Sequence, residues 1–466
     1  MEFIGREDEL EKFRSRFQSP SAELIFLYGR RRVGKTEFLR KFAEGKKAFF
    51  FSATESADFD QRSRFKNEML AFGIDCEHAL LNDWQGIFRN LSKLRSDKKT
   101  LVIIDEFQYM FIGDKAIPST LQNEWDAYLS KSNIMLVLCG SAMSFIEQKV
   151  LGGKNPLYGR ATAIFKMKEL PFSDAVRFFP KFTPQEKVIV YSILGGVPHY
   201  LKQFSPELNL VENIKQNILS RETILYNEIE FLLNKEFREV AVYNTIISAI
   251  AFGNTKLNEI SQKTMLEGSK ANAYINNLIE VGIVAKEFSV LDSIRDGANI
   301  QRGIYRIQNN FFRFWYKYIY PNKSEIELGY AANLADSILG SANTEFCSYV
   351  FEDICREFVT KLNFTGKLPI RARHIGKVFA KNLEVEIGAL ADKTIILGEC
   401  KWTNAPIDTG VLRDLQEKGT KHPALSVFSS QYYYLFSKCG FTKGLLDIAA
   451  PETHVKLFSL EDVLAD

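Results

Sequence analysis

The sequence lacks the features that mark secreted and membrane-spanning proteins. Its six cysteines are scattered through 466 residues without a C-x-x-C pair, so we expect reduced, structural thiols rather than a disulfide framework. No apolar run approaches the ~18 residues of a membrane span, and residues 1–8 contain no apolar signal core. We therefore expect a cytoplasmic protein with no membrane partner. A dominant charge is also missing, because 60 Lys+Arg face 57 Asp+Glu, and a net charge of +3 does not by itself indicate a polyanionic partner.

What the sequence does contain is a complete phosphate-binding loop of the pattern G-x-x-x-x-G-K-[ST]. Its residues are Gly29, Arg30, Arg31, Arg32, Val33, Gly34, Lys35 and Thr36. An apolar run at 24–28 precedes the loop and a helical segment at 37–42 follows it. The glycines let backbone N–H groups point at phosphates, Lys35 adds a positive charge for the β- and γ-phosphates, and Thr36 can ligate Mg²⁺. The pattern predicts a bound nucleoside triphosphate.

The first 170 residues predict a parallel α/β sheet, with candidate strands at 24–28, 48–52, 101–105, 135–139 and 164–167. Asp105 ends the third strand, where a Mg²⁺-linked carboxylate is expected, and Glu106 can polarise the attacking water. The alternative for this pair is a helix cap at a strand exit. Ser141 follows the fourth strand. It either lies between Asp105 and the γ-phosphate or belongs to an ordinary turn.

These segments together resemble the archaeal-type ATPase family, a STAND branch of AAA+-like P-loop NTPases found in archaea and bacteria. The resemblance is carried by residues 3–7, the loop at 29–36, residues 104–108 and residues 139–141. It implies ATP rather than GTP. It also implies that the segment at 156–160 brings Arg160 towards the γ-phosphate, and that residues 195–201 belong to a helical lid. The alternative for Arg160 is a surface loop arginine. Arg30, Arg31 and Arg32 either touch phosphates or form a solvated or partner-facing edge.

A different pattern follows the lid. Residues 257–260 and 269–279 predict two helices separated by a turn near 266–268, and a strand starts near 284. This order suits a winged helix, whose last helix would be offered to a DNA groove. We expect that helix to present Lys270, Asn272, Tyr274 and Asn276 outwards. A protein-docking or lid-coupling role fits the same pattern equally well.

The last part of the chain holds a second candidate site. Residues 383–390 and 395–402 read as two strands joined by a turn at 391–394. This register sets Glu386 opposite Glu399 and Glu384 opposite Lys401, on one face. Facing carboxylates repel unless a cation lies between them, so a divalent metal held by Glu386 and Glu399 would remove the conflict, with Lys401 positioning or polarising a water. The alternative is a solvated face with a Glu384–Lys401 ion pair. The spacing by itself favours this alternative, because charged residues are common.

A carboxylate followed by Glu399-x-Lys401 on the paired strand resembles the PD-(D/E)xK nuclease fold. The resemblance implies catalytic roles for Glu386, Glu399 and Lys401, and a further carboxylate, Glu352, from the preceding helix. The chain departs from that family at Glu386, where the family has an aspartate. Because metal geometry is sensitive to the extra methylene, the alternative is an inactive or altered nuclease-like domain.

We therefore predict an α/β fold in which a P-loop NTPase parallel sheet with a helical lid is followed by a winged helix and an α/β PD-(D/E)xK-like domain. The expected boundaries are 1–170 for the ATPase core, 171–235 for the lid and linker, 236–321 for the winged helix and 335–466 for the nuclease-like domain. The predicted function is binding and hydrolysis of ATP with Mg²⁺, coupled to domains that contact DNA or protein, in a chain able to form oligomers. The alternative is a nucleotide-dependent protein-binding switch or scaffold with an inactive nuclease-like domain.

Overall fold

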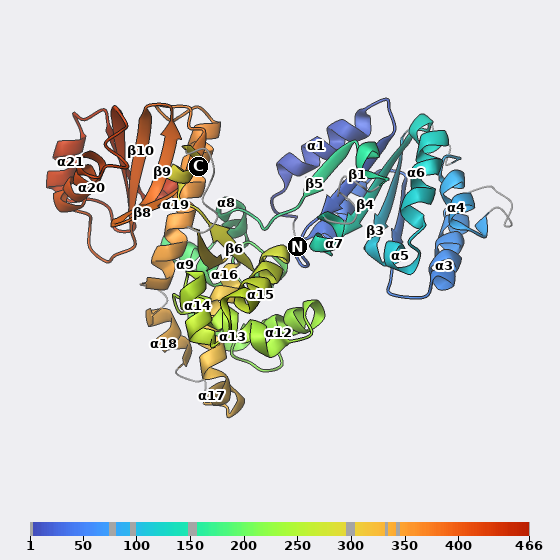
Figure 1. The fold of residues 1–466 in the computed structure, drawn as a ribbon, viewed down its shortest axis with the longest axis horizontal. Coiled ribbons are helices and arrows are strands. Elements are labelled where there is room, and N and C mark those ends of the chain that lie inside the picture. Colours follow the sequence, from blue (N-terminus) through green and yellow to red (C-terminus); the bar gives the residue numbers. More distant parts are fainter. Residues whose placement is uncertain are drawn as a thin grey trace. The chain divides into compact units, whose positions relative to one another are not determined.

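The computed structural model describes residues 3–73, 81–93, 99–147, 156–294, 303–330, 334–341 and 345–465. The chain folds into two compact units, drawn in Figure 1. The first ends at Leu170 and also includes Val197–His199, whereas the second comprises Pro171–Gly196 and the chain from Tyr200 onwards. Across the described ranges, no helix combines the length and apolar character needed to cross a bilayer.

The first unit is built around a five-stranded sheet in which every strand pair is parallel. The strands are β1 (Glu23–Tyr28), β2 (Ala48–Ser52), β3 (Thr100–Asp105), β4 (Ile134–Gly140) and β5 (Ala163–Lys166). Their spatial order is β2-β3-β4-β1-β5. The predicted strands are confirmed to within one residue at each end, and so is the α/β fold of this unit.

Helices cover both faces of this sheet, because alternate strand residues point to opposite sides. Ile25 and Leu27 belong to the core cluster of α1 (Glu7–Gln18) and α2 (Lys35–Ala43). Leu24 and Phe26 belong to the cluster on the other face. The helices of that face are α3 (Asp58–Ala71), α4 (Trp84–Leu91), α5 (Gln108–Gly113) and α6 (Ile117–Ala127). Burial on both faces explains why these strands read as continuous apolar runs.

The second unit opens with a helical region. Its helices are α8 (Phe172–Ala175), α9 (Pro184–Leu194), α10 (Pro198–Leu201), α11 (Leu210–Asn217), α12 (Ile224–Glu236), α16 (Asn310–Phe314), α17 (Lys323–Glu327) and α18 (Leu334–Ser341). Capping boxes fix two of the starts, since Thr183 pairs with Glu186 before α9 and Asn209 pairs with Glu212 before α11. Although α10 begins at Pro198, Val197–His199 group with the first unit.

Within the second unit, three helices are followed by a two-stranded antiparallel sheet. They are α13 (Val240–Ala251), α14 (Leu257–Thr264), α15 (Gly268–Glu280), β6 (Val284–Glu287) and β7 (Ile304–Ile307). The two predicted helices and the following strand are present. The outward position of Tyr274 is wrong. Its ring packs edge-on against Tyr243 at 5.0 Å between centroids, and its hydroxyl contacts Glu239.

The C-terminal part forms a second five-stranded sheet of mixed type. Its strands are β8 (His374–Ala380), β9 (Leu383–Ala391), β10 (Thr394–Lys401), β11 (Ser430–Ser437) and β12 (Val455–Ser459), side by side in the order β12-β11-β10-β9-β8. The first three pair antiparallel, and β10, β11 and β12 pair parallel. The pairing of Thr394 with Ala391 continues to Gly398 with Ile387, so the predicted register is confirmed over this stretch.

Helices also cover this second sheet. They are α19 (Cys347–Phe364), α20 (Thr409–Lys421), α21 (Lys443–Ala449) and α22 (Leu460–Ala465). On one face, Phe358 of α19 meets Phe436 and Phe458 edge-on. On the other face, residues of α20 and α21 share a core with Val385 and Leu397. That core also contains Val290 and Leu291, which precede β7 in the sequence.

Candidate functional site

The phosphate-binding loop lies between the end of β1 and the start of α2. Gly34 has a φ of 91°, a conformation that side chains rarely adopt. Gly29 is restricted by space instead, since a Cβ there would lie 2.2 Å from the Met167 carbonyl oxygen. The two glycines therefore have separate roles: one allows the loop to turn, and the other allows the chain after β5 to approach.

Lys35 is buried at the base of the loop, with 6% of its surface exposed. Its Nζ donates to the carbonyl oxygens of Gly29 and Arg30, at 2.9 Å in both cases. Burial lowers the pKa of this ammonium. A cation held by neutral carbonyls has not gained a full counter-charge, so a phosphate anion would be a stronger partner.

Thr36 and Asp105 meet where a nucleotide-bound cation would be held. The Thr36 hydroxyl donates to Asp105 Oδ2 at 2.7 Å, although the residues are 69 positions apart. Asp105 ends β3 and is 3% exposed. A hydroxyl and a carboxylate are hard oxygen donors of the kind that Mg²⁺ prefers, so this pair fits the predicted ion. The convergence of loop and strand end predicted from the sequence is present.

Glu106 is held in an unusual backbone conformation beside this pair. Its φ is 52°, in the left-handed region that a residue with a side chain occupies only when its surroundings enforce it. Its carboxylate Oε2 accepts from the Ser141 hydroxyl at 2.7 Å and also contacts the Gln108 amide. Ser141 therefore orients Glu106. The sequence offered a position between Asp105 and the γ-phosphate or an ordinary turn for Ser141, and neither alternative named Glu106 or Gln108 as its neighbours.

The three arginines of the loop are half-buried. Arg30 forms an ion pair with Glu169 at 3.2 Å. Arg32 contacts His199, which belongs to the short segment Val197–His199 that is grouped with the first unit. Arg30 and Arg32 thus connect the loop to Glu169 and His199.

Arg160 does not face the loop of its own chain. It lies just before β5, and the neighbouring Thr162 N–H donates to Leu24 O at the start of β1. The phosphate-binding loop follows the other end of β1, about 17 Å away along the strand. Arg160 instead forms an ion pair with Asp126 at 2.9 Å. Arg160 therefore does not reach the phosphate-binding loop of its own chain, because it lies at the amino ends of the strands and the loop follows their carboxyl ends. A role at the γ-phosphate of a neighbouring copy stays a prediction.

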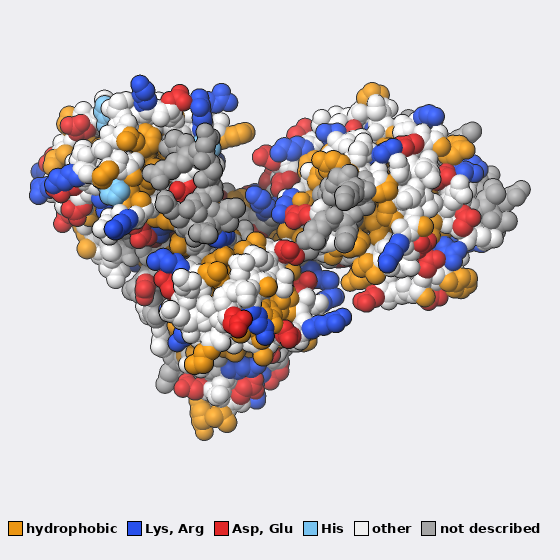
Figure 2. Space-filling model, viewed as in Figure 1, with side chains coloured by type: hydrophobic (Ala, Val, Ile, Leu, Met, Phe, Trp, Pro, Cys, Tyr) orange, Lys and Arg blue, Asp and Glu red, His pale blue; other side chains and the backbone are white. Residues whose placement is uncertain are grey.

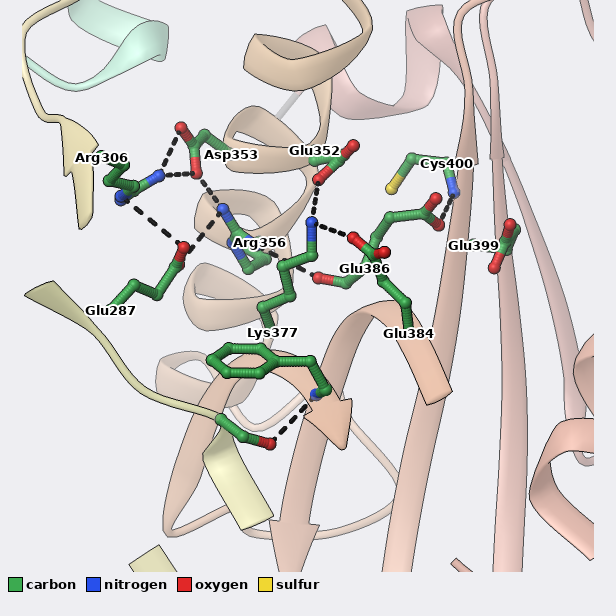
Figure 3. A network of polar contacts seen from close by, with 12 residues as sticks. Glu287, Arg306, Glu352, Asp353, Arg356, Lys377, Glu384, Glu386, Glu399 and Cys400 are labelled. Atoms are coloured by element: carbon green, nitrogen blue, oxygen red, sulfur yellow. Dashed lines mark hydrogen bonds and ion pairs between the residues drawn. The ribbon is translucent and has the colours of Figure 1, made fainter. Parts of the chain in front are cut away.

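At the second candidate site, Glu386 and Glu399 are neighbours, although the regular pairing of β9 with β10 ends at Ile387 and Gly398. Figure 3 draws them from adjacent strands, β9 and β10. Glu386 Oε2 accepts from the Cys400 backbone N–H at 2.9 Å. Burial, and then the nearby Glu399 carboxylate, raise the pKa of Glu386 above its usual value. The pair therefore favours one bound proton over two negative charges.

Lysines neutralise most of the other carboxylates here. Lys401 Nζ lies 2.6 Å from Glu399 Oε1, and Lys418 of α20 lies 3.6 Å from Glu399 Oε2. Glu384 pairs with Lys377 at 2.7 Å, so the alternative of a Glu384–Lys401 ion pair is wrong. Lys377 also approaches Glu352 at 3.4 Å. Across the described ranges, no three His, Cys, Asp or Glu side chains converge in a group able to hold a metal ion. The two carboxylates alone make an incomplete ligand set.

A half-buried ring of alternating charges connects this sheet to β6 and β7 (Figure 3). Arg306 of β7 donates to both oxygens of Asp353, at 3.0 and 3.1 Å. Arg356 contacts the same carboxylate and lies 3.9 Å from Glu287 of β6. Arg356 Nη1 also donates to the backbone oxygen of Glu386 at 3.2 Å. We call Glu287, Arg306, Asp353 and Arg356 the charge ring.

Comparison with known proteins agrees with the geometry of the loop. Residues 3–204 match a family described as an ATPase domain predominantly from Archaea. Residues 315–419 match a family described as Archaea bacterial proteins of unknown function. An uncharacterised protein of Methanocaldococcus jannaschii is 33% identical over 402 residues, which cover 86% of this chain and 87% of that protein. The chain belongs to the archaeal-type ATPase family.

Other relatives of this archaeal-type ATPase agree in part of the chain. An uncharacterised ATP-binding protein of the same organism is 51% identical over 45 residues, which are 10% of this chain and 76% of that protein. The Walker-type ATPase PABY2304 of Pyrococcus abyssi superposes with a TM-score of 0.53 at 19% identity, covering 68% of this chain and 96% of that one. At that identity the likeness concerns the fold, which is that of a P-loop ATPase.

Sequence reasoning missed several polar residues of this ATPase. Gln108 lies inside the segment that carried the resemblance, so its position beside Glu106 could have signalled a role. Lys377 and Lys418 lie on β8 and α20, far in sequence from the carboxylates that they neutralise. No local spacing indicates such partners.

Proposed function

We propose that this chain binds ATP with Mg²⁺ at the phosphate-binding loop and hydrolyses it. The proposal is supported above all by the contact of Thr36 with Asp105, because this hydroxyl and carboxylate meet at the carboxyl ends of the strands, next to the buried Lys35. Thr36 and Asp105 would hold Mg²⁺, which supplies positive charge to the phosphates when bound. Lys35 would bind the β- and γ-phosphates in place of the loop carbonyls.

Glu106 is the proposed group for the attacking water. Its carboxylate can accept a hydrogen bond from that water and orient it for attack. Ser141 and Gln108 direct the carboxylate, and the left-handed backbone at Glu106 aims the side chain out of the strand direction. ATP affinity by titration, and phosphate release by the wild-type chain and Glu106→Gln, test this proposal. Absence of ATP binding by the wild-type chain would reject it.

We further propose that nucleotide state is coupled, in the manner of a STAND-type ATPase, to residues 236–466. In this proposal α13, α14 and α15 with β6 and β7 act as a winged helix. The C-terminal sheet acts as a nuclease-like module that contacts nucleic acid. The strand order of that sheet and the neighbouring Glu386 and Glu399 support this interpretation.

A second candidate is a nucleotide-dependent switch that binds only proteins, with an inactive nuclease-like domain. Lys401 and Lys418 favour it, because both are close to the Glu399 carboxylate that a metal would need. Nucleic-acid binding that weakens steeply with salt would support the first candidate, whereas its absence would support the second.

A further inference from the structure

A groove of about 1070 Å³ lies within the second unit. One wall comes from the first turns of α14 and α15 together with β6 and β7, and the other from the end of β8 and the start of its connection to β9. The polar residues that line it include Lys256, Asn258, Ser269, Asn272, Lys286 and Lys381. The helix pair and the C-terminal sheet thus contribute to one concave surface.

The lining of this groove is positive. Among the described residues that line it, Lys256, Lys286 and Lys381 face one carboxylate, Asp292. Lys256 is exposed and lies 3.5 Å from Glu259, whereas the Lys286 ammonium lies 5.0 Å from the centroid of the Tyr305 ring. On the face drawn in Figure 2, Lys and Arg are interspersed with Asp and Glu instead of gathering into one positive field. The groove is therefore a local concentration of positive charge on a nearly neutral protein.

We propose that this groove binds the sugar–phosphate backbone of a nucleic acid. The proposal rests on the proposed function and deepens it, because it names where the polymer lies. The volume is at the upper end of the range for small-molecule pockets, which suits a polymer segment better than one small ligand. Lysines and amides contact phosphates and sugars, whereas Tyr305 is only 3% exposed and cannot offer its face to a base.

The groove also ends close to the carboxylates of the C-terminal sheet. Phe379 lines the groove and pairs directly with Glu384 on β9. Glu386 follows two residues later on the same face of that strand. A backbone held along the groove would therefore run towards β9, the strand that carries Glu384 and Glu386.

The test compares two pairs of lysines in the full-length chain. Lys256→Ala/Lys381→Ala removes two exposed lysines of the groove. Lys393→Ala/Lys443→Ala removes two exposed lysines that do not line it. Both variants lower the net charge equally. Binding of a fluorescein-labelled DNA duplex and of a DNA single strand is measured by anisotropy over a series of salt concentrations. ATP affinity and thermal unfolding are measured on the same samples.

We expect the groove variant to bind DNA about 10- to 100-fold more weakly than the wild type at moderate salt, with the control variant close to wild type. The slope of log K against log salt should fall by about 1.8 for the duplex, or about 1.4 for the single strand, whichever form occupies the groove. Equal losses in both variants, or no DNA binding by the wild type, would overturn the groove proposal. With ATP binding intact, the ATPase proposal would stand; loss of DNA binding in Glu399→Gln alone would move the contact to the carboxylates.

Discussion

At the scale of single residues, the ammonium of Lys35 gives a direct test of the nucleotide site. Lys35→Ala removes the charge that would bind the β- and γ-phosphates, and with it the two bonds to loop carbonyls. Because hydrogen bonds to charged groups are worth about 1.5–3 kcal/mol, we expect ATP affinity to fall about 100-fold. Isothermal titration measures this. Lys41→Ala, on the exposed side of the same helix, is the matched control, and equal affinity in the two variants would contradict the assignment.

Glu106 provides a residue-scale test of turnover. Glu106→Gln should keep ATP affinity and slow hydrolysis by ~10²–10⁴-fold, because the amide cannot act as a base. Ser141→Ala should also slow hydrolysis, since it removes the hydroxyl that orients the carboxylate. The two effects should not add in the double variant, because both act through one group. Phosphate-release assays measure all three variants, and a Glu106→Gln protein with wild-type turnover would exclude this role.

At the scale of elements, α19 carries a carboxyl group whose protonation is linked to stability. Glu357 accepts from the Phe172 backbone N–H at 3.1 Å, and burial raises its pKa from 4.5 to about 7. The folded state then binds more protons than the unfolded state between these values, so stability falls as pH rises from 4.5 to about 7. The loss should approach roughly 3 kcal/mol and stay constant above that range.

Glu357→Gln should remove this part of the pH dependence and leave a neutral acceptor for the same N–H group. Denaturant unfolding at several pH values, compared between wild type and variant, measures the difference. Parallel curves for the two proteins would show that Glu357 has the same pKa in the folded and unfolded states.

Elements were more predictable from the sequence than the contacts between them. Apolar runs such as 24–28 and 101–105 mark strands buried on both faces, and the turn at 391–394 fixes the register of β9 and β10. The contacts of Ser141, Tyr274 and Lys377 depend on segments far away in the sequence. Periodicity shows that a position faces outwards in an isolated helix, but Tyr274 is covered by α13 through Tyr243. The periodicity predicted the helix α15 correctly, but it contains no information about Tyr243, the neighbour from α13.

At the scale of the whole molecule, the position of Arg160 bears on assembly. Its side chain is 33% exposed and paired with Asp126. This pair lies at the amino ends of the strands, whereas the phosphate-binding loop of the same chain follows the carboxyl end of β1. We predict that Arg160 acts on ATP bound to a neighbouring copy. Arg160→Ala should lower turnover while ADP affinity stays unchanged. A mixture of Arg160→Ala and Lys35→Ala chains should regain activity, because each supplies what the other lacks.

Phosphate release from the mixture, measured across protein concentrations, checks this prediction. Activity equal to the sum of the separate variants, with no dependence on concentration, would argue against a shared site. Equal losses of ADP and ATP affinity in Arg160→Ala would indicate a structural role for its pair with Asp126.

We predict that the full chain binds a divalent metal ion at Glu386 and Glu399. Because burial and the nearby Glu399 carboxylate disfavour the charged form of Glu386, a divalent cation should replace the proton on Glu386 and displace Lys401 from Glu399. Calorimetry on the full chain without nucleotide should detect Mn²⁺ binding that Glu399→Gln loses and Glu417→Gln, an exposed control, retains. Without binding even when DNA is present, the C-terminal sheet would act as a contact surface without metal chemistry.

The charge ring limits how this chain can be cut or recombined. Asp353 and Arg356 belong to α19, but each has a charged partner outside it. Arg306 comes from β7 and Glu287 from β6, the two-stranded sheet that precedes α19 in the sequence. Val290 and Leu291 likewise complete the core of the C-terminal sheet. A fragment starting at residue 335 would expose an apolar edge and leave the half-buried charges of Asp353 and Arg356 without these counter-ions. During evolution, the C-terminal sheet should therefore be inherited together with β6 and β7. Gene fusions that exchange the C-terminal sheet without these two strands should yield insoluble protein.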